Sequence, residues 1–316
     1  MLNFLRSNNP IYFFFSAAII PVLALLYYVN SNNVLWHIES FFKLNPAVLY
    51  ALYSFTVFFT ALRINLIINK SVFFQKSNYA SGLIYVVLIG VFGNIHSSIN
   101  PLLGNLFLVL AVENLFKIFR NKSCKIEVFN ASCWLIISCF FYGLNAFVLP
   151  ALWLALYFIR PFQWREYIMP FIALIFLGAF FIPISLISDG FYPVFKKWLG
   201  NSWSIGYSKP VEWWYISLAL LVGLFICFSS LVYTFIKSTN RYKKISWTIV
   251  SLLVLTFIQF LFIKLVLNIE FPLFFVLAVP LSILLANAVL NSKYPWLIDS
   301  YLSLLILGRI LIEYVF

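Results

Sequence analysis

A few titratable side chains have the type and placement for chemistry on a substrate that carries phosphate. Glu39 and Asp189 are carboxylates of the kind that act as general base toward an acceptor hydroxyl. His96, in "GNIHSSINP", could position a phosphate or a hydroxyl group. Lys264 and Arg309 lie within apolar stretches, where a cation needs a partner such as a phosphate. We predict that these five residues line one site at the outer face of a membrane.

The same residues also have a structural interpretation. Outer loops of a membrane protein must be polar because they face water. Arg309 could be paired with Glu313, which lies four residues on and so on the same helix face. Lys264 could likewise be paired with Glu270 at the nearby helix end.

Motifs of soluble enzymes are absent from the sequence. It contains no G-x-x-x-x-G-K-[ST] or G-x-G-x-x-G phosphate-binding loop, no H-E-x-x-H and no G-x-S-x-G. With two histidines and no C-x-x-C pair, we predict no metal site and no cofactor. The sequence therefore argues against ATP hydrolysis and nicotinamide chemistry.

Composition places the chain in lipid. Hydrophobic residues make up 64% of the 316 positions, only 9% are charged, and the mean hydropathy is +1.00. Soluble domains are about half apolar and about a quarter charged, and they cannot bury such an excess. The formal charge of +12 is then explained by cytoplasmic loops and anionic headgroups, and we expect no nucleic-acid partner.

Apolar stretches long enough to cross a bilayer predict an all-α bundle, with residues 1–316 as one integral membrane domain. The longest connection is an outer loop over 188–211, which we expect to lie in the interface. Residues 129–159 contain no charge and would make a helix of about 46 Å, too long for a core of about 30 Å. Gly143, Asn145 and Pro150 predict a turn that splits this stretch into two short helices. The expected helices are 11–29, 47–68, 79–99, 101–119, 129–143, 144–159, 168–187, 212–236, 245–267, 270–290 and 296–314.

The distribution of Lys and Arg predicts the topology. With the amino terminus inside and eleven crossings, cytoplasmic segments hold fifteen Lys or Arg and outer segments hold four. A single crossing over 129–159 would reduce this bias to eleven against eight. Since cytoplasmic loops are enriched in Lys and Arg, we predict a cytoplasmic amino terminus and a periplasmic carboxyl terminus.

One cytoplasmic turn concentrates charge beside aromatic rings. In "IRPFQWREYIMP", residues 159–170, Arg160, Arg165 and Glu166 surround Trp164. Amphipathic rings and basic residues are typical of the membrane interface, so the turn could be an interfacial anchor. The alternative is that Arg160, Trp164, Arg165 and Glu166 dock a cytoplasmic partner.

Two resemblances extend these predictions. The segment "FNASCWLIISCFFYGLNAFVLPALWLALYFIRPFQWREYIMPFIAL", residues 129–173, and the opening "FLRSNNPIYFF" resemble a family of polytopic inner-membrane proteins of unknown function from Bacteroidota. Here Asn130 stands where that family usually has Asp. Genes of the family tend to neighbour those of glycosyltransferases.

The split apolar stretch also resembles the middle of membrane glycosyltransferases that use polyprenyl-phosphate sugars. These enzymes place a catalytic acid in the first outer loop. In this sequence the corresponding segment, "NSNNVLWHIESFFKLNP", carries Glu39.

These observations imply a multi-pass protein of the bacterial inner membrane that contacts lipids. The leading hypothesis is a subunit or accessory protein in envelope glycoconjugate assembly, beside a glycosyltransferase or another membrane subunit. The first alternative is a glycosyltransferase that uses a polyprenyl-phosphate-linked substrate. The second is a transporter of a lipid-linked or small anionic substrate, although the sequence shows no inverted repeat.

Overall fold

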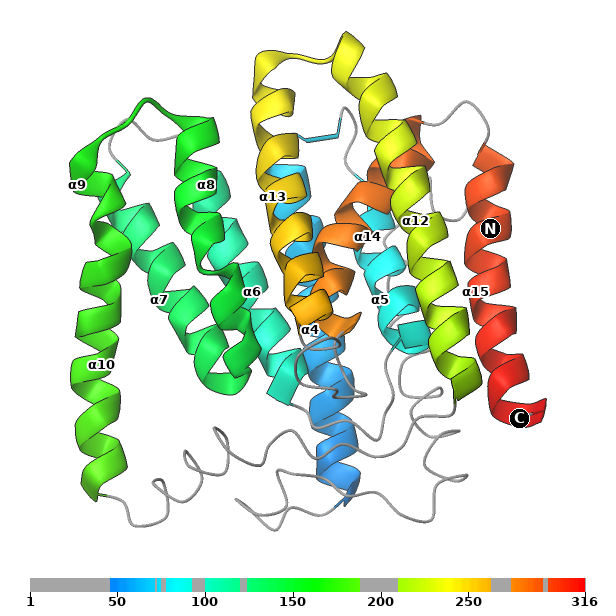
Figure 1. Cartoon of the computed structure of the whole chain (residues 1–316), viewed down its shortest axis with the longest axis horizontal. Helices are drawn as coiled ribbons and strands as arrows, with labels where there is room; N and C mark the ends of the chain where they lie inside the picture. Colours follow the sequence, from blue (N-terminus) through cyan, green and yellow to red (C-terminus); the bar gives the residue numbers. More distant parts are fainter. Residues whose placement is uncertain are drawn as a thin grey trace.

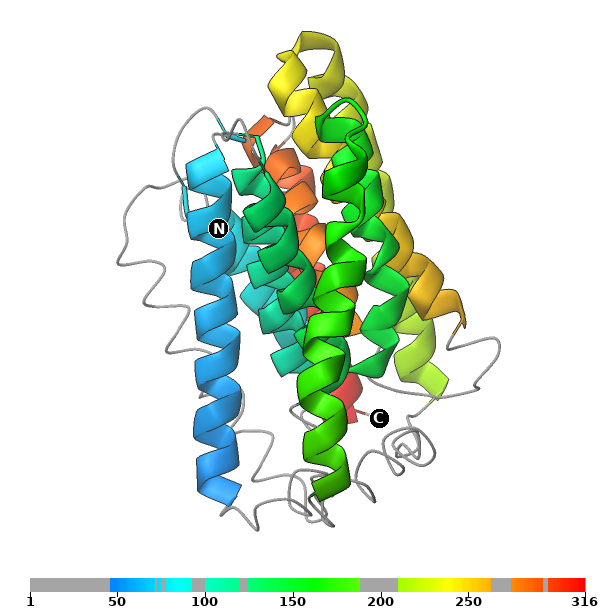
Figure 2. The ribbon, with the colours of Figure 1, turned by 90° about the vertical axis from the view of Figure 1, so that its left-hand side faces the viewer.

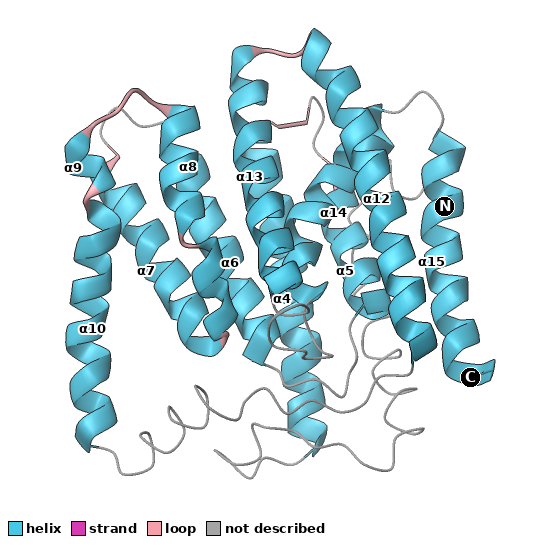
Figure 3. Cartoon of the chain, viewed as in Figure 1, coloured by secondary structure: helices cyan, strands magenta, loops and turns pink. Residues whose placement is uncertain are grey.

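A computed structural model describes residues 46–71, 73–74, 78–92, 100–119, 124–187, 210–262, 274–291 and 295–315. These residues form helices and short connections, with no strand among them, as Figure 3 shows. The helices are α4 (Pro46–Ser71), α5 (Ala80–Phe92), α6 (Asn100–Lys117), α7 (Lys125–Phe141), η1 (Gly143–Val148), α8 (Pro150–Ile159), α9 (Trp164–Tyr167), α10 (Met169–Ile187), α12 (Pro210–Lys237), α13 (Asn240–Phe262), α14 (Phe274–Asn291) and α15 (Pro295–Val315). The predicted all-α class is thus confirmed for this part of the chain.

Consecutive helices run in opposite directions through one bundle (Figure 1). The α8–α9 connection and the α12–α13 turn lie at the same end, which Figure 2 also shows, and we call this the junction end. A hydrogen bond also joins the two connections at this end, because Lys244 of α13 donates to the carbonyl of Ile159 at the end of α8.

The predicted turn inside the uncharged stretch is present. α7 ends at Phe141, the 3₁₀ helix η1 follows, and α8 begins with Pro150 at its first turn, where a missing N–H costs nothing. Asn145 is fully buried in the turn and donates from Nδ2 to Ser138 Oγ at 2.6 Å. Ser138 in turn donates to the carbonyl of Gly104 at 2.7 Å. The turn is therefore fastened to α6 by buried hydrogen bonds.

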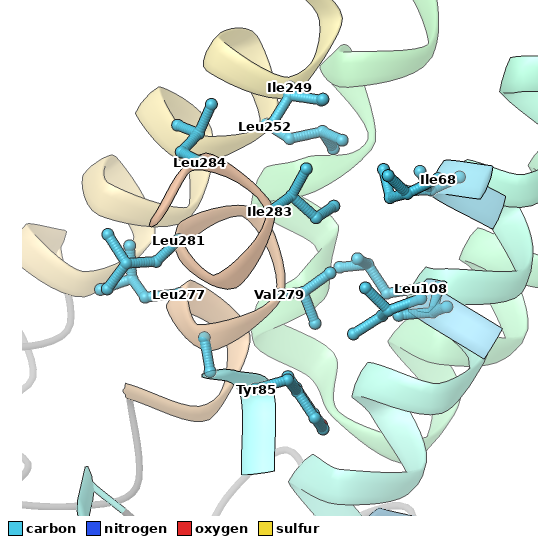
Figure 4. Close-up of a cluster of buried hydrophobic side chains, with 14 of the residues drawn as sticks. Ile68, Tyr85, Leu108, Ile249, Leu252, Leu277, Val279, Leu281, Ile283 and Leu284 are labelled. Atoms are coloured by element: carbon cyan, nitrogen blue, oxygen red, sulfur yellow. The ribbon is translucent and has the colours of Figure 1, made fainter. Parts of the chain in front are cut away.

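The core is built around α14, whose side chains between Val276 and Val289 are all buried. In Figure 4, Val279 and Ile283 point toward Ile68 of α4 and Leu108 of α6, with Tyr85 of α5 nearby. Helices α4, α5, α6, α12, α13 and α15 pack against α14, whereas α10 lies at the edge of the bundle against α7 (Figure 1). Between helices in lipid, close packing of this kind supplies much of the association energy.

The outward faces are apolar. Leu221, Phe225 and Phe228 of α12, and Phe171 and Ile175 of α10, are large and exposed. Soluble monomers rarely show contiguous apolar surface on this scale, whereas a lipid-facing helix requires it. In the described part of the chain, three segments are long and apolar enough to cross a membrane: Ala51–Ser71, Leu218–Ile236 and Asn240–Phe262.

Most described helices lie close to the ranges predicted from the apolar runs, but the start of α13 differs. α13 begins at Asn240, five residues before its predicted start. Its polar first turn is held in place because the Tyr242 ring stacks on Phe73 at 4.7 Å and its hydroxyl donates to Asn287 at 2.8 Å. The predicted helix 11–29 and residues 188–209 of the predicted outer loop 188–211 lie outside the described residues, and the last two residues of that loop belong to α12.

Basic side chains gather at the junction end. Among the described helices, Lys70 lies in the last turn of α4, Lys117 ends α6, Lys125 begins α7, and Arg241 lies in the first turn of α13. Each of these helix ends lies at the junction end (Figure 1). The described part of the bundle thus has one strongly basic end.

Candidate functional site

The connection between α8 and α10, which we call the junction, contains the four residues predicted to dock a partner. Pro161 follows the end of α8, and the chain then makes one helical turn, α9, before α10 begins at Met169. Within it, the amide of Glu166 donates to the carbonyl of Gln163 at 2.9 Å. The side chains of Arg160 and Glu166 point inward, whereas residues 161–165 are exposed.

The inward side chains form a buried ion pair. Arg160 Nη1 lies 3.8 Å from Glu166 Oε1, and Glu166 is only 2% exposed. Arg160 Nη2 also donates to the carbonyl of Ile118, which follows the end of α6, at 3.1 Å. A buried charge needs such compensation, because desolvating it alone costs several kcal/mol. The pair therefore fastens the α8–α10 connection to the end of α6.

A buried thiol shares this carbonyl. Cys124, at the start of α7, donates from Sγ to the Ile118 carbonyl at 3.6 Å. Burial raises the pKa of Cys124 to about 11; the charge of Arg160 works against this rise and that of Glu166 adds to it. Cys124 is therefore a neutral thiol at physiological pH, and it is not a nucleophile there.

Lys244 of α13 also holds the start of the junction in place. Its Nζ donates to the carbonyl of Ile159, the last residue of α8, at 2.9 Å. A cation at a helix carboxyl terminus satisfies an unpaired carbonyl and interacts favourably with the helix dipole. Lys244 and Arg160 thus act as caps, one at the end of α8 and the other just beyond α6.

The outward side chains form a separate surface. Phe162, Trp164 and Arg165 are exposed, Trp164 by 60%. We call these three residues the junction surface. The guanidinium carbon of Arg165 lies 5.6 Å from the centre of the Trp164 ring, and the Phe162 ring lies 4.7 Å from that of Tyr167. Aromatic rings and arginine on a rigid support are the composition that protein interfaces favour.

The four predicted docking residues therefore separate into two pairs. Glu166 is buried and Arg160 is partly buried, and each is engaged by the protein itself, which favours a structural role; their assignment to partner docking stays a prediction. Trp164 and Arg165 remain available. The sequence could not separate them, since the direction of each side chain depends on the backbone of the turn.

The predicted phosphate-binding site at the outer face involves mostly residues outside the described part of the chain. Glu39, His96, Asp189 and Lys264 lie outside the described residues. Arg309 lies within α15, but its side chain is outside the description. The predicted convergence of these residues on one phosphate-binding site stays a prediction.

A second charged cluster lies between α4 and α6. Glu113 of α6 lies 3.7 Å from Lys117, as their spacing of four suggests, but also 3.4 Å from Arg63 of α4. Arg63 lies inside α4, eight residues before Ser71. A charge in the middle of an apolar run is the signal that could have indicated a partner on another helix.

The described part of the chain holds no group of three or more His, Cys, Asp or Glu side chains that could bind a metal ion. The candidate site formed by described residues is thus the junction. Its inner part is the ion pair of Arg160 and Glu166, and its outer part is the exposed Trp164 and Arg165. No protein-family model, curated protein or solved structure matches this chain.

Proposed function

We propose that the chain is a multi-pass protein of the bacterial inner membrane, with eleven crossings, a cytoplasmic amino terminus and a periplasmic carboxyl terminus. The gathering of basic residues at the junction end supports this orientation, since Lys and Arg are enriched on the cytoplasmic side. The junction surface then faces the cytoplasm at the level of the lipid headgroups.

We further propose that the protein is a subunit or accessory protein in envelope glycoconjugate assembly, and that the junction surface docks a partner such as a membrane glycosyltransferase. The observation that carries the docking role is the division of the junction into a buried ion pair and exposed Trp164 and Arg165. A preorganised support lowers the entropic cost of binding through exposed side chains. The link to lipid-linked sugars rests on the resemblance of residues 129–173.

The two alternative functions depend on other residues. A transferase would use Glu39 or Asp189 as base, and a transporter would need a cavity near the bilayer midplane. The residues proposed for the transferase lie outside the described part of the chain, and no described contact favours either function.

A complementation experiment tests the proposal. We expect a deletion strain to accumulate or lose lipid-linked sugar intermediates, measured by mass spectrometry of extracted lipids. The wild-type gene should restore the profile, and the double variant Trp164→Ala/Arg165→Ala should not, although its amount in the membrane is unchanged. The matched control is Trp296→Ala/Lys125→Ala, which removes an exposed Trp and an exposed basic residue from the same end and should restore the profile.

Two results would contradict the proposal, each in a different part. An unchanged lipid-linked sugar profile in the deletion strain would reject the glycoconjugate role. Full restoration by Trp164→Ala/Arg165→Ala would reject the junction surface as the docking site. If the control double variant also failed, the loss would reflect general interfacial anchoring, and the docking role would again be rejected.

A further inference from the structure

The cluster of Arg63, Glu113 and Lys117 carries more positive than negative charge. Arg63 Nη1 lies 3.4 Å from Glu113 Oε2, and Lys117 Nζ lies 3.7 Å from Glu113 Oε1. Lys117 also donates to Asn114 Oδ1 at 3.1 Å. One carboxylate thus serves two cations, which leaves a net charge of one positive on the seam between α4 and α6.

The cations face outward and the carboxylate faces inward. The side chains of Arg63 and Lys117 are 35% and 51% exposed, whereas that of Glu113 is 13% exposed. Lys117 is the last residue of α6, and Glu113 lies one turn before it, about 6 Å along the axis. The cluster therefore lies just below the junction end, at the boundary between headgroups and acyl chains.

An apolar strip continues from the cluster along α4. Phe55, Phe59 and Arg63 follow at intervals of four residues and so share one helix face. The Phe55 and Phe59 rings stack at 5.9 Å, and the guanidinium carbon of Arg63 lies 5.1 Å from the centre of the Phe59 ring. Phe55 is exposed. A cationic end joined to an exposed aromatic strip matches a ligand that has an anionic head and an apolar tail.

We propose that this seam binds an anionic phospholipid of the leaflet at the junction end, with the lipid phosphate between Arg63 and Lys117 and an acyl chain along Phe55 and Phe59. An uncompensated cation at this depth is costly, and a phosphodiester would neutralise it through charge-assisted hydrogen bonds. Glu113 offsets part of the positive charge of the two cations and so stabilises the cluster in the absence of a lipid. This inference rests on the proposed membrane insertion and does not need the accessory role.

The test measures lipid affinity with the purified full-length protein. Phosphatidylglycerol and phosphatidylcholine with identical acyl chains are titrated separately into protein in detergent, and binding is followed by native mass spectrometry. We expect the wild type to prefer phosphatidylglycerol. Arg63→Gln and Lys117→Gln should each weaken phosphatidylglycerol binding about fivefold, the effect of one basic residue at a lipid surface. Lys125→Gln, which removes an exposed lysine from the same end, should change it less than twofold.

Glu113→Gln separates lipid binding from simple ion pairing. The variant loses the carboxylate and raises the net charge of the cluster, so phosphatidylglycerol affinity should be maintained or increased, even though the fold is destabilised. Lys117→Gln keeps the test valid if Arg63→Gln does not fold, because Lys117 is half exposed at a helix end.

Three outcomes would overturn the inference. Equal affinity for the two lipids would show that the cluster is a closed ion network. An equal loss in Lys125→Gln and Lys117→Gln would show only nonspecific attraction to a basic surface. Displacement of phosphatidylglycerol by millimolar inorganic phosphate would show a site for free anions rather than for a lipid.

Discussion

Replacing Glu166 by Gln should destabilise the protein by about 2 kcal/mol, because it removes the charge that balances the partly buried Arg160. Breaking a buried pair costs about 3–5 kcal/mol in general. Here the cost is reduced because the pair is long, at 3.8 Å, and because Arg160 keeps its hydrogen bond to the Ile118 carbonyl. Hydrogen bonds to charged groups contribute about 1.5–3 kcal/mol, which gives the expected value.

The appropriate assay is a double-mutant cycle on the free energy of unfolding, measured by titration with sodium dodecyl sulfate in mixed micelles. Arg160→Gln, Glu166→Gln and the double variant should show a coupling energy of about 1–2 kcal/mol, in the range of contacting pairs. Arg165→Gln is the matched control: it removes an exposed arginine from the same turn and should change stability by less than about 0.5 kcal/mol. Additive effects of Arg160→Gln and Glu166→Gln, within about 0.5 kcal/mol, would refute the claim that this pair fastens the junction.

Gly82, Tyr242 and Cys124 each offer a further test of the packing. Gly82→Ala should lower the free energy of unfolding by about 1–3 kcal/mol, because its Cβ would meet the side chain of Asn65 where α4 and α5 approach closely. Tyr242→Phe should lower it by about 1 kcal/mol, because the hydroxyl donates to the fully buried Asn287. A variant that keeps Cys124 as its only cysteine should resist alkylation at pH 7.5 in the folded state, since burial raises the thiol pKa to about 11. The unfolded thiol ionises near pH 9, so this raised pKa contributes stability below pH 9 that is lost between pH 9 and 11.

Controls make these three results decisive. Gly90→Ala changes an exposed position of the same helix and should be neutral or stabilising. If it lowered the free energy of unfolding as much as Gly82→Ala, the loss could not be due to the close approach of α4 and α5 at Gly82. Tyr157→Phe, at an exposed tyrosine, should leave stability unchanged. Rapid labelling of folded Cys124 at pH 7.5, at the rate of a cysteine placed at the exposed position 165, would contradict its burial.

The sequence predicted the helices well because apolar runs and their interruptions determine where a chain can cross lipid. The turn at Gly143–Val148 was predictable from Gly143, Asn145 and Pro150, since a helix of the full length would not fit the bilayer. The start of α13 was not, because its first turn is polar and is ordered by Phe73 and Asn287, which are distant in sequence.

The candidate site was predictable only in part. The clustering of charge and aromatic residues over 159–170 predicted a turn there, and the structure has the connection between α8 and α10 at this place. The inward direction of Glu166 depends on the Ile118 carbonyl and on Arg160 across the turn, which a single sequence does not reveal. Likewise, Arg63 and Glu113 are fifty residues apart, and only the packing of α4 on α6 brings them together.

The central claim is that the basic junction end faces the cytoplasm in a chain with eleven crossings. The most direct measurement uses reporter fusions at Lys122, Lys197, Lys243 and Phe316, with paired reporters that are active either in the cytoplasm or in the periplasm. We expect cytoplasmic, periplasmic, cytoplasmic and periplasmic signals in that order. A periplasmic signal at Lys243 would contradict the account, because Lys243 lies at the junction end with Lys244, whose side chain caps α8.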